Sequence, residues 1–182
     1  EYYVNDAGNQ INNMALSLQA RVLQVCGLEA SIPQDGYHGQ DLIDIANELI
    51  TLHGIEIVNQ PIEFFKNEGL VKELDKIKRD LKTFNVEFDV FTSEQSIYDA
   101  HKVEETLKRL KELDSVYESE GALWLKTSDY GDDKDRVLVK GDGTYTYLLP
   151  DIAYHKDKYD RGFKKCVNFL GADHHEIGRA HV

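Results

Sequence analysis

The chain has 182 residues, of which 41% are hydrophobic and 30% are charged, and its formal net charge is −12. This size is enough for one large domain or two small ones, and the acidic balance argues against a broad, non-specific nucleic-acid surface. No stretch has the length and apolarity of a membrane span, and the two cysteines suit a reducing compartment, so we expect a soluble protein of the cytoplasm.

The first two thirds of the chain predict a strand followed mainly by helices. EYYV at the start is an aromatic and β-branched strand signal, and the turn cluster NDAGN follows it. EFDVFTS alternates like a second short strand. Apolar residues recur at helical spacing in four segments, 11–25, 42–52, 74–84 and 103–113. Gly27 and Gly54 are expected to end the first two of these helices.

The last third changes to short β-rich runs. ALWLK, RVLVK and TYTYLL read as strands, and the last two are joined by the hairpin turn signal Gly141-Asp142-Gly143. Pro150 is expected to start a helix that runs to about Tyr159, and CVNFLG reads as a buried strand. Strands at both ends with helices between them are typical of a helical insertion inside a parallel α/β domain. Both ends of the chain look cut, which indicates a piece of a larger protein.

The first candidate site is the stretch YTYLLPDIAYH, which places Tyr147 and Asp151 four residues apart at the start of the predicted helix. In the plain interpretation, Asp151 is a helix N-terminal acid that contributes about 1 kcal/mol or less. In the functional interpretation, its carboxylate accepts two parallel N–H bonds from a guanidinium, with the Tyr147 ring beside it.

The second candidate is LGADHH, where a predicted strand ends at Gly171 and Asp173 follows. Ligands bind at the carboxyl ends of parallel strands, and an aspartate there can accept protons from ribose hydroxyls. Asp173, His174, His175 and His181 also permit a metal site, but adjacent histidines rarely converge on one ion, so we favour no metal.

Two loops are further candidates. In NDAGNQ, an ordinary interpretation has Asn5 or Asp6 capping the next helix while Gly8 adopts unusual dihedral angles. In GYHGQD, His38 has no nucleophile fixed beside it, and we interpret it as part of loop packing.

Four segments taken together closely resemble the arginyl-tRNA synthetase family. They are EYYVNDAGNQI, GYHGQDL, ALWLKTSDYGDDKDRVLVKGDGTYTYLLPDIAYHKDKYDRGF and NFLGADHH, in this order. The resemblance thins over 59–116 and ends after His175. It implies an α/β fold with a partial Rossmann-like parallel sheet of the class I synthetases, formed by 1–27 and 117–182. A mostly helical connective insertion, 28–116, interrupts it.

The resemblance also implies an activity and its partners. The parent would be an aminoacyl-tRNA ligase that activates L-arginine with ATP to arginyl-adenylate and transfers it to the 3′ end of tRNA(Arg). Mg²⁺ would accompany ATP, with no tightly bound cofactor. We expect the parent to be a cytoplasmic monomer with no membrane partner, and the isolated chain to self-associate through exposed sheet edges.

The family's site residues map onto this sequence by position. Its arginine pocket has a tyrosine and an aspartate four residues apart, which match Tyr147 and Asp151, and a Gln or His that matches His175. Gly171 and Asp173 match the strand-end motif beside the ATP ribose. A motif that borders the active site matches Asn5, Asp6, Gly8 and Gln10.

The chain departs from the family in lacking its HIGH-type and KMSKS-type motifs, and the tail after His175 does not continue the family pattern. We therefore assign no catalytic residue within these 182 residues and expect the chain alone to be inactive. The alternatives are a non-catalytic arginine-binding or interaction module derived from such a synthetase, and a metal-dependent hydrolase that uses 173–175.

Overall fold

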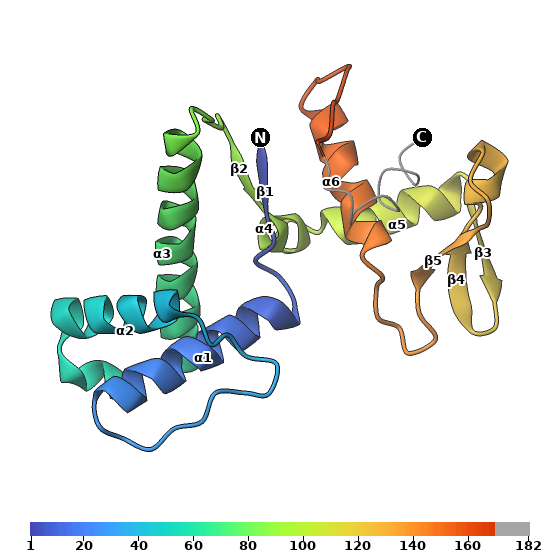
Figure 1. Cartoon of the computed structure of the whole chain (residues 1–182). Coiled ribbons are helices and arrows are strands. Elements are labelled where there is room, and N and C mark those ends of the chain that lie inside the picture. The colour runs from blue at the N-terminus through green and yellow to red at the C-terminus, as the bar shows by residue number, and fades with distance from the viewer. Residues whose placement is uncertain (170–182) are drawn as a thin grey trace. The chain divides into compact units, whose positions relative to one another are not determined.

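The computed structural model describes residues 1–169, and its contacts divide the chain between Ser93 and Glu94 into two compact units (Figure 1). The first unit contains β1 (Tyr2–Val4), α1 (Asn9–Val25), α2 (Gln40–His53), the 3-10 helix η1 (Ile55–Asn59), α3 (Ile62–Thr83) and β2 (Phe91–Ser93). The second contains α4 (Glu94–Asp99), α5 (Lys102–Glu112), β3 (Val116–Ser119), β4 (Ala122–Leu125), the 3-10 helix η2 (Thr127–Tyr130), β5 (Arg136–Val139) and α6 (Leu148–Asp160). The predicted division into a catalytic fold (1–27 and 117–182) and an insertion (28–116) differs from this division into two compact units, and it stays a prediction.

The predicted mixed α/β class is confirmed. β1 and β2 pair in parallel, with Val4 opposite Ser93, so the strand expected in EFDVFTS exists and joins the strand that opens the chain. β3, β4 and β5 form a separate antiparallel sheet in that order. The four predicted helices are present as α1, α2, α3 and α5, and Gly27 and Gly54 follow the first two with positive φ angles of 79° and 77°.

Helix α3 begins at Ile62, well before the predicted start. The first turns were not predicted because they contain a glycine, which disfavours a helix in the sequence pattern. Gly69 lies in the helix interior, where glycine is a poor helix former. A Cβ on Gly69 would lie 2.6 Å from the Met14 sulfur and 3.1 Å from a Leu18 methyl group. The glycine thus lets α3 approach α1 closely, and tertiary packing overrides its low helix propensity.

Three predictions for the last third were wrong. TYTYLL forms only an isolated bridge between Val139 and Tyr145, and α6 begins at Leu148 rather than at Pro150, because Leu149 is needed in the core, where it is fully buried. The described part of CVNFLG has no regular structure and is not buried, since the Phe169 side chain is 94% exposed. The structure also contains α4 and β3, which were not predicted: α4 is only one and a half turns long, and β3 carries polar residues.

The core of the first unit lies where α1, α2 and α3 meet. Phe65 of α3 is fully buried at its centre, packed edge-on against Phe64 at a ring separation of 5.3 Å. Its other buried members are Ile11, Met14, Leu18, Val22, Leu42, Ile45, Ala46, Leu49 and Ile57. Burial of these side chains holds the three helices together. The helical periodicity predicted the members from α1 and α2 except Ala46, but not Phe65 or Ile57, and three residues that it placed on apolar faces are exposed: Val25, Leu52 and Phe84.

A polar stripe on α1 holds the loop between α1 and α2. The buried Ser17 hydroxyl accepts the Tyr37 N–H at 2.9 Å, and Arg21 Nη2 donates to the His38 carbonyl at 3.0 Å. Gln24 Nε2 donates to the Ala30 carbonyl at 2.8 Å. These contacts use the loop's backbone, in agreement with the interpretation of His38 as part of loop packing. Within residues 1–169, no helix is long and apolar enough to cross a membrane.

Candidate functional site

Helix α6 presents the first candidate site residues at its start. Tyr147 directly precedes the helix and its side chain is 83% exposed. The Asp151 N–H donates to the Tyr147 carbonyl at 3.2 Å, so the two residues are one helical turn apart, as predicted. Asp151 is half-buried in the first turn, where the backbone N–H groups and the helix dipole favour an anion.

A second helix brings another carboxylate to this region. Helix α4 packs against α6 and begins at Glu94, which is only 8% exposed. Tyr98 also belongs to α4, and burial raises the pKa of its phenol. The charges of Glu94 and Asp151 raise this pKa further, together with Tyr145 and Glu104, so both carboxylates lie within electrostatic reach of the same hydroxyl.

This arrangement suits recognition of a cation. Glu94 and Asp151 supply negative charge from two different helices in a partly buried setting, where a charge interacts more strongly than in water. A guanidinium has five N–H donors in a planar fork, so it can bond to carboxylates on more than one side. Tyr98 adds a hydroxyl, and burial raises the pKa of this phenol above its ordinary value.

Sequence reasoning missed Glu94 and Tyr98. Glu94 directly follows β2, and the carboxyl end of a parallel strand is a common ligand position, so this signal was available. Tyr98 carries no comparable signal, because its place beside Asp151 depends on the packing of α4 against α6.

The segment Asn5–Gln10 lies in the first unit, whereas Asp151 lies in the second. The predicted cap was wrong: Gly8, with φ 85°, is the N-cap of α1, and no side chain bonds to the cap position. The Asp6 side chain is instead buried, at 7% exposure, while Asn5 and Gln10 are exposed. The predicted unusual dihedral angle of Gly8 is confirmed.

The remaining predicted site residues lie outside the described part of the chain. These are Gly171, Asp173 and His175, together with His174 and His181 of the metal alternative. Among residues 1–169, no group of three or more His, Cys, Asp or Glu side chains is arranged to hold a metal ion.

Comparison with known proteins decides the family. Residues 57–176, more than half of the chain, match the family described as class I (R) tRNA synthetases, catalytic domain. The chain belongs to the arginyl-tRNA synthetase family.

Individual synthetases match almost the whole chain. Arginine–tRNA ligase 1 of Halalkalibacterium halodurans is 56% identical over 179 residues, and arginine–tRNA ligase of Bacillus subtilis is 54% identical. Each match covers 96% of this chain but only 32% of the relative, so the chain spans about a third of these synthetases.

Solved synthetase structures have the same fold. A crystal structure described as an arginyl-tRNA synthetase from Campylobacter jejuni superposes with a TM-score of 0.86 at 40% identity, covering 98% of this chain and 40% of that one. The arginyl-tRNA synthetase of Plasmodium falciparum, at 14% identity over 87% of this chain and 27% of that one, shares only the fold, with a TM-score of 0.54.

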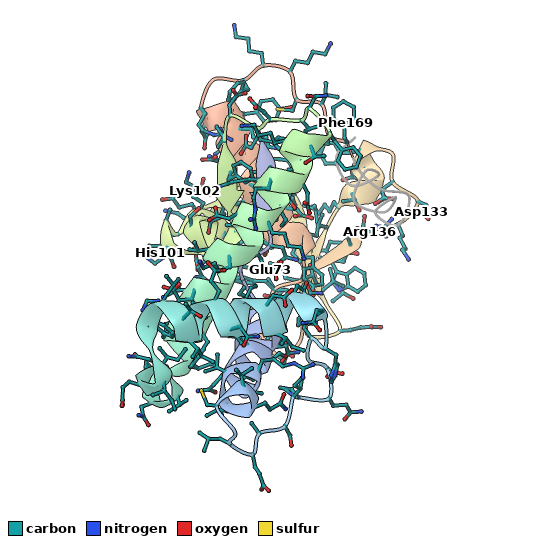
Figure 2. All side chains as sticks on the ribbon, turned by 60° about the vertical axis from the view of Figure 1, so that its left-hand side comes forward. Glu73, His101, Lys102, Asp133, Arg136 and Phe169 are labelled. Carbon is teal, nitrogen blue, oxygen red and sulfur yellow. The ribbon has the colours of Figure 1, made fainter. Side chains whose placement is uncertain are left out.

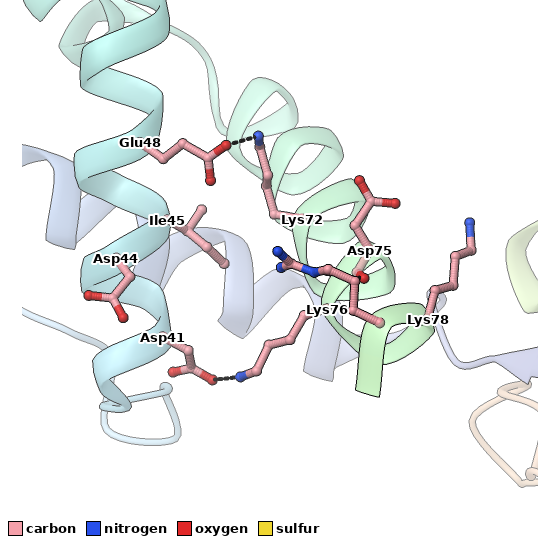
Figure 3. A pocket seen from close by; sticks show the side chains of 9 residues that line it. Asp41, Asp44, Ile45, Glu48, Lys72, Asp75, Lys76 and Lys78 are labelled. Carbon is pink, nitrogen blue, oxygen red and sulfur yellow. Dashed lines mark hydrogen bonds and ion pairs between the residues drawn. The ribbon is translucent and has the colours of Figure 1, made fainter. Parts of the chain in front are cut away.

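The synthetase chain also has a charged groove between α2 and α3, with a volume of about 780 Å³ (Figure 3). Glu48 on α2 binds Lys72 on α3 at 2.5 Å, and Asp41 binds Lys76 at 3.1 Å. The groove is lined by four acidic side chains, four basic side chains and one apolar side chain, namely Asp41, Asp44, Glu48, Asp75, Lys72, Lys76, Lys78, Arg79 and Ile45. Because these charges balance and two pairs bridge the helices, the groove has the character of a solvated helix contact.

The bridge between Asp41 and Lys76 gives a testable titration. The hydrogen bond from Lys76 holds the pKa of Asp41 below its ordinary value of 3.8. A lowered carboxyl pKa stabilises the fold above the unfolded-state pKa, and this contribution disappears as the pH falls through the folded-state pKa. We expect Lys76→Met to raise the pKa of Asp41, measured from its carboxyl NMR shift. Lys72→Met, which removes the neighbouring bridge to Glu48, is the matched control, and an equal response to both changes would contradict this assignment.

Proposed function

We propose that the chain is part of an arginine–tRNA ligase whose full length matches that of its relatives. This enzyme activates L-arginine with ATP and transfers it to the 3′ end of tRNA(Arg). The observation that carries the proposal is the half-buried Asp151 in the first turn of α6, with Tyr98 and the buried Glu94 beside it. The 56% identity to an arginine–tRNA ligase supports the same substrate class.

In the proposed pocket, Asp151 accepts N–H bonds from the arginine guanidinium. Glu94 adds a second carboxylate, and Tyr98 offers a hydroxyl within electrostatic reach of both the Glu94 and the Asp151 carboxylates. The exposed ring of Tyr147 lines the side of the pocket nearer the reacting end of the substrate. His175, which lies outside the described residues, would complete the pocket. The ammonium group of lysine carries the same charge at a single nitrogen and lacks the planar fork of a guanidinium. This pocket therefore favours arginine over lysine.

The ATP side of the proposal rests on sequence. Gly171 and Asp173 would lie beside the ATP ribose, and Mg²⁺ would come with the nucleotide. Asn5, Asp6, Gly8 and Gln10 would border the active site. In the fold we propose, 1–27 and 117–182 belong to a Rossmann-like catalytic domain, and 28–116 is its connective insertion.

The reaction requires positioning and charge neutralisation rather than a covalent protein intermediate. The arginine carboxylate attacks the α-phosphorus of ATP and displaces pyrophosphate, which leaves arginyl-adenylate. The terminal ribose hydroxyl of the tRNA then attacks the activated carbonyl, loses its proton and displaces AMP. By holding the guanidinium end of arginine, Asp151 fixes where the carboxylate end of the same molecule lies. In favourable cases such orientation lowers an activation barrier by an amount on the order of 7–11 kcal/mol.

The chain alone should not catalyse the first step. These 182 residues contain no HIGH-type or KMSKS-type motif, the groups that stabilise the reacting phosphates in the family. We expect no arginine-dependent exchange of pyrophosphate into ATP by the isolated chain, and clear exchange by the full-length enzyme. Exchange by the isolated chain would contradict the expected inactivity. Arginine binding without exchange by the full-length enzyme would favour a non-catalytic arginine-binding module.

A further inference from the structure

A second carboxylate on α6 lies away from the proposed arginine pocket. The Asp157 side chain is only 9% exposed and binds two cations. Lys102, in the first turn of α5 and labelled in Figure 2, donates from Nζ to Oδ1. Arg161, one turn later at the C-cap of α6, donates from Nε to Oδ2 at 2.8 Å. Each carboxylate oxygen is therefore bound from a different direction.

Asp151 and Asp157 point to different neighbours of the same helix. They are six residues apart, so at about 100° per residue their side chains lie about 120° apart around the helix axis. Asp151 lies within electrostatic reach of Tyr98 on α4, whereas Asp157 is bonded to Lys102 on α5. Both α4 and α5 pack against α6. The helix is thus held on two faces, one towards the pocket and one towards α5.

The apolar contacts of α6 set which of its faces is buried, and Asp157 adds a directional bond to this face. Leu149 and Ala153 are buried, at 0% and 1% exposure, but apolar burial is non-directional. A charged hydrogen bond is directional, so the bond from Asp157 to Lys102 on a neighbouring helix resists rotation of α6. Since a buried carboxylate is costly without partners, the network also penalises any orientation that breaks the bond to Lys102.

We propose that Asp157 is a positioning residue for arginine recognition. Its bond to Lys102 on α5 fixes the rotation of α6, while Arg161 at the end of the same helix holds the carboxylate in place. This rotation sets the direction of the Asp151 carboxylate. Two parallel N–H bonds to a guanidinium demand that direction more strictly than a single bond does. This inference rests on the proposed function, because it requires that Asp151 binds arginine.

The test uses the full-length enzyme and its KM values for arginine and ATP. Asp157→Asn keeps the side-chain shape but removes the charge, and Lys102→Met removes the partner on α5 while Arg161 still binds Asp157. We expect Asp157→Asn to raise the KM for arginine about tenfold, because misplacement of about 1 Å costs up to about a hundredfold. Lys102→Met should raise it less, Lys102→Arg should restore it, and the KM for ATP should stay unchanged.

The control is Asp160→Asn. Asp160 binds Lys156 at 2.5 Å on the exposed surface of the same helix and does not link it to α5. This variant should keep the KM for arginine of the unmodified enzyme. A purely structural Asp157 would lower the melting temperature without a selective change in the KM for arginine, and that result would overturn the proposal.

The outcomes also separate this inference from the proposed function. If Asp157→Asn yields no folded enzyme, Lys102→Met decides alone, and an unchanged KM for arginine in that variant overturns the positioning role. If Asp151→Asn weakens arginine use while both other variants do not, only the positioning role fails. If the unmodified enzyme does not use arginine, both proposals fail.

Discussion

Asp151→Asn in the full-length enzyme should lower kcat/KM for arginine by about 30-fold or more, which corresponds to about 2 kcal/mol of lost charged hydrogen bonding. Asparagine keeps the size of the side chain but replaces one acceptor oxygen by an NH₂ group and removes the charge. Glu94 remains in place and keeps part of the attraction for the guanidinium, so binding is weakened rather than abolished. Steady-state aminoacylation at varied arginine concentrations measures the effect.

The same variant should change the order of substrates. Citrulline has a neutral urea group in place of the guanidinium, so it loses less binding energy than arginine when the Asp151 carboxylate is removed. The ratio of kcat/KM for citrulline to kcat/KM for arginine should therefore rise. Asp160→Asn, at the exposed far end of the same helix, is the charge-matched control and should behave like the unmodified enzyme. An unchanged kcat/KM for arginine in Asp151→Asn would refute the pocket assignment.

Phe65→Ala should destabilise the first unit by about 3–5 kcal/mol, the range observed for truncation of a buried phenylalanine. The Phe65 side chain is fully buried among residues of α1, α2 and α3, so its removal leaves a cavity that all three helices line. Because domains are stable by only about 5–15 kcal/mol, this is a large fraction of the total. Guanidinium-induced unfolding of the chain, followed by circular dichroism, measures the loss.

Phe84→Ala is the matched control for the core. Phe84 follows α3 directly, and its side chain is 80% exposed, so the same truncation removes little buried surface. We expect its midpoint of unfolding to stay close to that of the unmodified chain. Equal destabilisation by the two changes would contradict the placement of Phe65 at the centre of this core.

The sequence predicted α1 and α2 well because their apolar faces repeat at helical spacing. Ile11, Met14, Leu18 and Val22 lie on one face of α1, and all four are buried. The prediction failed where local and tertiary preferences disagree. Leu148 and Leu149 follow a β-rich run but belong to α6, because burying Leu149 in the second unit outweighs the strand preference of its neighbours.

The candidate site was predictable only in part, for the same reason. The separation of Tyr147 and Asp151 by one helical turn followed from their spacing and from a proline in the first turn. Glu94 and Tyr98 reach Asp151 through the packing of α4 on α6, and no local pattern encodes a contact between segments about 50 residues apart. The role of Asp157 depends on another such contact, with Lys102.

Aminoacylation of total tRNA by the full-length enzyme, offered arginine, lysine, glutamine or citrulline in turn, tests the central claim most directly. The account predicts that arginine alone is charged at a substantial rate, and that Asp151→Ala lowers this charging at least as strongly as Asp151→Asn does. No charging of any amino acid by an enzyme that still binds arginine, or equal charging of lysine, would contradict it.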